Sequence, residues 1–120
     1  MTPFATALAK GEHSKEISCK HTHVVLSFTG TLDVETITVQ ASPDGGQNWF
    51  TYRSDDAAGA AESSTITATD IGSGGMFSRV YIAGGQRLRA TLSSGAGTVS
   101  AVNCWVGGPV ASDISGVQGT

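Results

Sequence analysis

Apolar and polar residues alternate along most of the chain, which is the pattern of strands that bury one face. The clearest case is the run ETITVQAS, which places Ile37, Val39 and Ala41 on one face and threonines and a glutamine on the other. Alternation begins earlier, at Ile17, and continues with Val24, Leu26 and Phe28 on one face. These runs predict strands that are buried on one side and exposed on the other.

Five further runs predict strands, namely NWFTYR, TITAT, FSRVYIA, RLRATL and TVSAVNCWV. In FSRVYIA, Val80 and Ile82 fall on one face. Clusters of Gly, Ser, Pro and Asp separate the runs, as turns do. Short alternating strands with regular turn signals indicate an all-β protein. We expect an antiparallel β-sandwich that is jelly-roll-like, with an immunoglobulin-like strand order as the alternative.

The two ends of the chain lack this period. The sequence therefore predicts an extended N-terminal arm at residues 1–15, a β-sandwich domain at 16–108 and a flexible C-terminal tail at 109–120. A chain of 120 residues fits one domain with one core. Termini without a period usually fray unless something ties them down.

Composition excludes several classes of protein. The net charge is −3 and the pI is about 5.4, so no basic surface for nucleic acid is expected. No apolar run approaches the roughly 20 residues of a membrane span. No segment has the make-up of a signal peptide, so we expect synthesis in a cytoplasm and reduced cysteines.

The stretch SPDGGQNW, from Ser42 to Trp49, resembles the Asp-box of sialidase-type propellers. Asp44 would accept hydrogen bonds across the turn, and Gly46 would supply a positive φ. The chain is too short for a six-bladed propeller, whose blades need about 40 residues each. No pair of positioned carboxylates is visible for glycoside hydrolysis. We therefore interpret Ser42, Asp44, Gly46 and Trp49 as a staple that fixes a hairpin.

One combination of residues has the chemistry of a zinc site. Cys19, His21 and His23 share a strand face, and Cys104 from another strand would complete a Cys₂His₂ set. The spacing matches no common zinc module, and two buried thiols beside two histidines is the plainer interpretation. We expect no cofactor and no catalytic residues.

Aromatic residues offer a second alternative. They would form a sugar-binding platform if they were exposed on one sheet face, although aromatic residues usually fill the core of a small domain. The candidates are Trp49, Phe50, Tyr52, Tyr81 and Trp105.

Taken together, the runs FTGTLDVETITVQASPDGGQNWFTY and GQRLRATLSSGAGTVSAV resemble a group of small tailed-phage virion proteins. These proteins have a β-sandwich domain and serve as head decoration, cement or fibre-associated proteins. The resemblance covers about residues 28–106 and rests on turn and strand motifs. It implies no catalytic residues.

The resemblance implies a capsid decoration or cement protein that bridges capsomers on the virion surface. Its partners would be the major capsid protein and further copies of itself in a homotrimer, with neither nucleic acid nor membrane. Pro3 and Phe4 would contact the capsid, because Phe4 is an apolar anchor on an otherwise polar arm. The alternative is a carbohydrate- or receptor-binding module of a head or tail fibre.

Overall fold

The computed structural model describes residues 2–53, 65–72, 74–99, 101–107 and 113–120. These residues form ten strands and one short helix, and none of their helices has the length and hydropathy needed to cross a membrane. The elements, in chain order, are β1 (Thr2–Leu8), β2 (Glu16–Ser18), β3 (His23–Thr29), β4 (Ile37–Ser42), β5 (Phe50–Thr51), β6 (Thr65–Ile66), α1 (Ala68–Ile71), β7 (Met76–Ile82), β8 (Arg87–Leu92), β9 (Val102–Gly107) and β10 (Asp113–Ser115).

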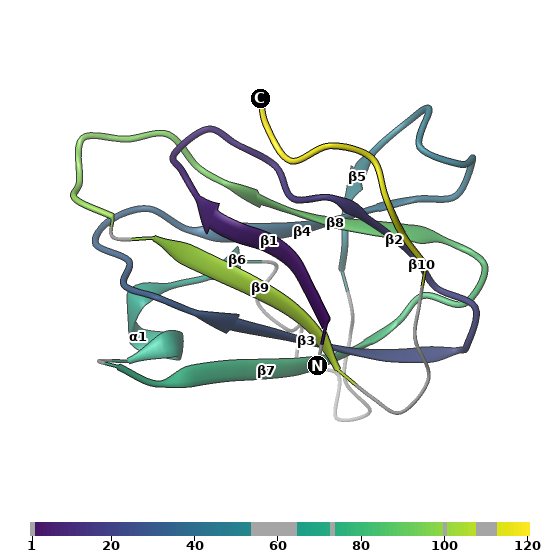
Figure 1. The fold of residues 1–120 in the computed structure, drawn as a ribbon, viewed down its shortest axis with the longest axis horizontal. Coiled ribbons are helices and arrows are strands. Elements are labelled where there is room, and N and C mark those ends of the chain that lie inside the picture. The colour runs from purple at the N-terminus through teal and green to yellow at the C-terminus, as the bar shows by residue number, and fades with distance from the viewer. Residues whose placement is uncertain (1, 54–64, 73, 100, 108–112) are drawn as a thin grey trace.

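The strands form two antiparallel sheets that pack together as a sandwich (Figure 1). One sheet has four strands in the order β1-β9-β3-β7. The other has six, in the order β10-β2-β8-β4-β5, with β6 also paired to β4. The all-β sandwich predicted from the alternation is confirmed, and the choice between jelly-roll-like and immunoglobulin-like order stays a prediction.

The core lies between the sheets and is built by the alternation in the sequence. In β4 the residues Ile37, Val39 and Ala41 are buried, and the residues between them are half-buried. The same alternation holds in β8 and β9. Strand register is therefore fixed by burial, because a shift of one residue would expose every core side chain.

The predicted N-terminal arm is wrong. Residues 2–8 form β1, which pairs with β9, and Phe4 is only 1% exposed. The Phe4 ring meets the Phe28 ring edge-on, with 6.5 Å between centroids. Two register shifts in the β1–β9 pairing, together with a φ of 50° at Ala7, break the period-two pattern. A bulged strand of this kind cannot be recognised by alternation.

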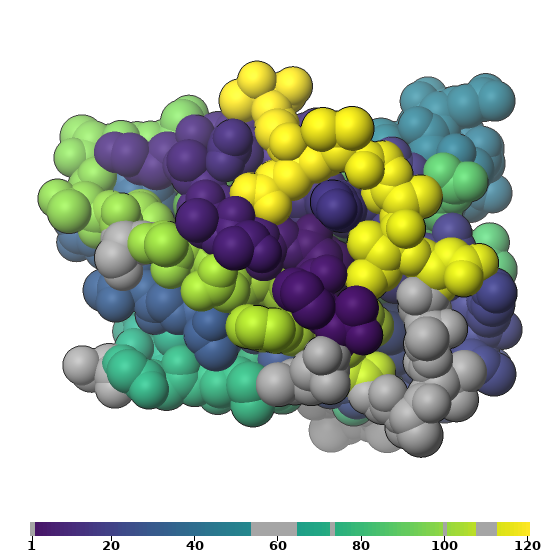
Figure 2. Space-filling model, in the orientation of Figure 1, coloured from purple at the N-terminus to yellow at the C-terminus, as the bar shows by residue number. Residues whose placement is uncertain are grey.

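The predicted C-terminal tail is also wrong for the part that the structure describes. β10 pairs with β2. The N–H of His13 donates to the carbonyl oxygen of Gly119, with 2.8 Å between nitrogen and oxygen. In Figure 2 the C-terminal residues, in yellow, lie against the N-terminal strand in purple. These C-terminal residues are held mainly by main-chain hydrogen bonds. Such bonds do not require apolar and polar side chains to alternate, so the sequence carries no sign of the pairing. The sandwich therefore extends beyond the predicted limits of 16–108 at both ends.

Helix α1 replaces part of a predicted strand. The run TITAT pairs only through Thr65 and Ile66, and the chain then turns into α1. The N–H of Thr67 donates to Asp70 Oδ2 at 2.8 Å, which is one half of a capping box. Ile71 then enters the core beside β7.

Candidate interaction site

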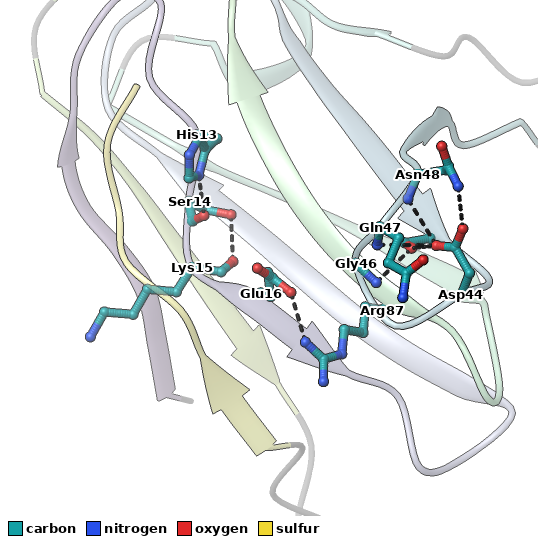
Figure 3. A network of polar contacts seen from close by, with 10 residues as sticks. His13, Ser14, Lys15, Glu16, Asp44, Gly46, Gln47, Asn48 and Arg87 are labelled. Carbon is teal, nitrogen blue, oxygen red and sulfur yellow. Dashed lines mark hydrogen bonds and ion pairs between the residues drawn. The ribbon is translucent and has the colours of Figure 1, made fainter.

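The hairpin turn between β4 and β5 is organised by one carboxylate. Asp44 Oδ1 accepts the hydroxyl of Ser42 at 2.7 Å and the N–H groups of Asn48 at 2.9 Å and Gln47 at 3.1 Å. The side-chain amide of Asn48 donates to the other oxygen, as Figure 3 shows. Hydrogen bonds from the Asn48 main chain, then from the side chains of Asn48 and Ser42, lower the pKa of Asp44 to about 2.

Two further residues of the motif complete the staple. Gly46 donates its N–H to Ser42 Oγ at 2.8 Å and has a φ of 96°, which favours glycine. A Cβ at Gly46 would lie 3.0 Å from Glu16 Oε1, so the turn also sits close to β2. The Trp49 ring lies 4.3 Å from the guanidinium carbon of Arg89. The structure therefore brings Ser42, Asp44, Gly46 and Trp49 together as a stable turn with every Asp44 oxygen engaged.

The structure does not bring the zinc candidates together. Cys19 and Cys104 are buried free thiols, whereas His21 and His23 are exposed. Burial raises the pKa of Cys19 to about 11 and that of Cys104 to about 12, so both stay protonated and pack as small apolar groups. No three Cys, His, Asp or Glu side chains among the described residues are placed to hold a metal ion.

The aromatic residues do not form one platform. Tyr81 is 1% exposed and packs edge-on against Tyr52, with 4.9 Å between ring centroids. Trp105 is half-buried in β9 of the four-stranded sheet, and its indole N–H lies 3.4 Å from Thr29 Oγ1. Phe50 differs from the rest, because it is 59% exposed.

An open groove lies where β5 and the end of β7 approach each other. Its volume is about 450 Å³, and its walls include Pro43, Phe50, Tyr52, Arg53, Ile82 and Gln86. Phe50 and Ile82 are more than half exposed there. Tyr52 joins the two walls, because its hydroxyl oxygen accepts the N–H of Ile82 at 2.9 Å. We call these lining residues the Phe50 groove.

The outer face of β7 continues from this groove. Met76, Val80 and Ile82 alternate along it and are 52%, 52% and 56% exposed. Apolar side chains scattered over a surface are normal, but a row along an outer strand is typical of a contact surface. The sequence placed Val80 and Ile82 on one face but did not identify that face as the exposed one. Tyr81 lies on the opposite face of β7 and its ring is buried, so the core-facing side of this strand is the one that carries the large aromatic residue.

Sequence reasoning also missed Glu35, the one charged side chain in the described core. Its Oε2 accepts the N–H of Gly97 at 2.9 Å, while Oε1 has no partner among the described residues. Lys10 Nζ donates to the carbonyl oxygens of Gly95 and Gly97 at 3.0 and 2.7 Å. Together these groups anchor the β8–β9 loop. The glycines are the sequence signal, because a Cβ on Gly97 would lie 2.7 Å from Glu35 Oε1.

Comparison with known proteins adds no relative: no protein-family model, curated protein or solved structure matches the chain.

Proposed function

We propose that the chain is a structural protein of a virion, of the head-decoration or cement class, and that it acts by docking rather than by catalysis. The Phe50 groove carries this proposal. A rigid sandwich that presents an apolar hollow beside an exposed arginine is suited to binding another protein surface. The resemblance of the turn and strand motifs to tailed-phage virion proteins supplies the class of partner, which is the major capsid protein.

The residues proposed for the contact change with the structure. Phe4 cannot be the capsid anchor, because its side chain is enclosed in the core. Pro3 is exposed but lies within β1, opposite Trp105 of β9. Phe50 takes over the role of the apolar anchor, since it is the most exposed aromatic residue of the described chain.

The test is binding of the purified chain to phage heads that lack it. We expect Phe50→Ala to weaken binding by about tenfold or more, as loss of an aromatic anchor does. Val117→Ala is the matched control, because Val117 is 78% exposed but does not line the groove. Equal binding by both variants would contradict the proposal.

A carbohydrate-binding module of a fibre is the second candidate function. One observation favours it: the exposed Phe50 ring shares the groove with the polar side chains of Arg53 and Gln86. Sugars bind by stacking on an aromatic ring while side chains of this kind hydrogen-bond their hydroxyls. Glycan binding that is lost in both Phe50→Ala and Gln86→Ala would favour this function over cement.

A further inference from the structure

The outer edge of β7 has its main-chain groups directed away from the sheet. Tyr52 shows their direction, because its hydroxyl accepts the N–H of Ile82 and lies 3.5 Å from the carbonyl oxygen of Ile82. The next residue, Ala83, donates its N–H to Thr22 on the β3 side. In an antiparallel strand, the main-chain N–H and C=O groups of successive residues point alternately toward one neighbouring strand and away from it. Met76, Ser78 and Val80 therefore direct their N–H and C=O groups outward, as Ile82 does.

Within the described part of the chain, these outward groups have no partner over part of the strand. Tyr52 occupies those of Ile82, but no described residue hydrogen-bonds to the outward main-chain groups of Met76, Ser78 or Val80. The β3–β7 register runs without a shift from Met76 to Ile82, so no bulge turns the edge away. An unprotected edge of this kind pairs readily with another strand.

We propose that β7 pairs antiparallel with β7 of a second copy of this chain, about a two-fold axis at Ser78. The register follows from the open stretch, whose midpoint is Ser78. An axis at Val80 would place Ser78 opposite Ile82 of the second copy, where Tyr52 already holds the main chain. An axis between Ser78 and Val80 would use Ile82 as well.

The side chains match in this register. Met76 lies opposite Val80 of the second copy on the outer face, so two exposed apolar side chains cover each other at both ends. On the inner face Arg79 lies opposite Phe77 of the second copy. Arg79 already stands over its own Phe77 ring, 5.1 Å from its centroid, so the pairing brings a second ring to the same cation.

The pairing is independent of the proposed virion function, and it differs from the homotrimer that the resemblance implies. A ring of three needs β7 to pair with a different edge of its neighbour. The outer edge of β1 is occupied, since Gln118 holds both main-chain groups of Thr6 and Lys15 donates to the carbonyl of Phe4. The two-fold pair needs only the open edge.

A cysteine at the axis tests the register directly. We expect Ser78→Cys to form a disulfide-linked dimer on oxidation with diamide, which accepts the two hydrogens of the thiols. Residues directly opposite in a strand pair have Cα atoms about 5.5 Å apart, within reach of a disulfide. The native thiols are buried and do not interfere. Met76→Cys is the matched control, because two copies of residue 76 would lie about 13 Å apart.

Light scattering of the chain over a range of concentrations provides the second measurement. We expect the mass to rise from 12.2 kDa for one chain toward that of a dimer. Val80→Pro removes one outward donor and leaves the β3 pairing intact, so it should keep the circular dichroism of the parent and stay monomeric. A monomeric or trimeric parent chain, or equal cross-linking of Met76→Cys and Ser78→Cys, would overturn the proposal.

Discussion

The outer strands of the four-stranded sheet, β1 and β7, are both seven residues long, but their edges differ. β1 is bulged, and its outward groups are occupied by Gln118 and Lys15. β7 is regular, and among the described residues Tyr52 caps its end at Ile82 and nothing caps Met76, Ser78 or Val80. The β1 edge is thus protected by Gln118 of the C-terminal segment and by Lys15, whereas the β7 edge is left for the contact that we propose.

The same difference appears in the side chains. β1 buries Phe4, Ala5 and Leu8 in the core. β7 buries Tyr81 but exposes three large apolar residues on its outer face. A seven-residue edge strand with exposed apolar side chains favours association, whereas a bulged and covered strand favours a stable monomer fold. β1 therefore contributes mainly to the core, whereas the outer face and edge of β7 provide the contacts that we propose.

The largest expected change in the free energy of unfolding comes from a substitution in β1, whose edge is occupied. Phe4→Ala should lower the free energy of unfolding by about 3–5 kcal/mol, because it empties the space against Phe28. Pro3→Ala, one residue away but exposed, should change it by about 0.5 kcal/mol or less. Urea denaturation of both variants measures the difference. If Phe4→Ala were as stable as Pro3→Ala, β1 would not be part of the core.

Removal of the cap on β1 should have a smaller effect. Gln118→Ala loses a donor and an acceptor to Thr6, at 2.8 and 2.9 Å, and should cost about 1 kcal/mol. Gln118→Glu keeps an acceptor for the N–H of Thr6 and should lose less. Urea denaturation gives the cost, and hydrogen exchange at Thr6 shows whether the edge has opened. An unchanged exchange rate would mean that Gln118 does not protect this edge.

The mirror experiment removes the cap on β7. Tyr52→Phe keeps the ring against Tyr81 but loses the hydroxyl that accepts the Ile82 N–H. We expect a cost of about 1 kcal/mol or less, because water replaces the lost partner. The open stretch then extends to Ile82, so self-association should strengthen in light scattering. Weaker association with unchanged stability would contradict the open-edge account.

The hairpin turn between β4 and β5 should give the smallest effect, and the effect should depend on pH. The pKa of Asp44 is lowered to about 2 in the folded chain, compared with an ordinary value of 3.8. The carboxylate therefore stabilises the fold fully at pH values above 3.8. This stabilisation is lost as pH falls through about 2. Asp44→Asn should therefore lower the Tm at pH 7 by an amount that shrinks between pH 4 and pH 2. A constant difference would exclude Asp44 as the titrating group.

Much of the sandwich is predictable from alternation, as Ile37, Val39 and Ala41 show, because one-sided burial dictates a period of two. β1 is not predicted because its bulges bury Ala5 next to Phe4 and leave Thr6 exposed, which breaks that period. The hairpin staple was predictable, since Asp and Gly have specific roles in turns. The Phe50 groove was not, because it depends on how the edge strands of two sheets meet.

The most direct test of the open β7 edge is residue-resolved amide hydrogen exchange of the parent chain at low and high concentration. The account predicts fast exchange at Ser78 and Val80 in dilute protein and slow exchange when the chain is concentrated, with Thr6 protected at both. Protection of Ser78 and Val80 equal to that of Thr6 in dilute monomer would contradict it, because their N–H groups would then already have a partner within the chain.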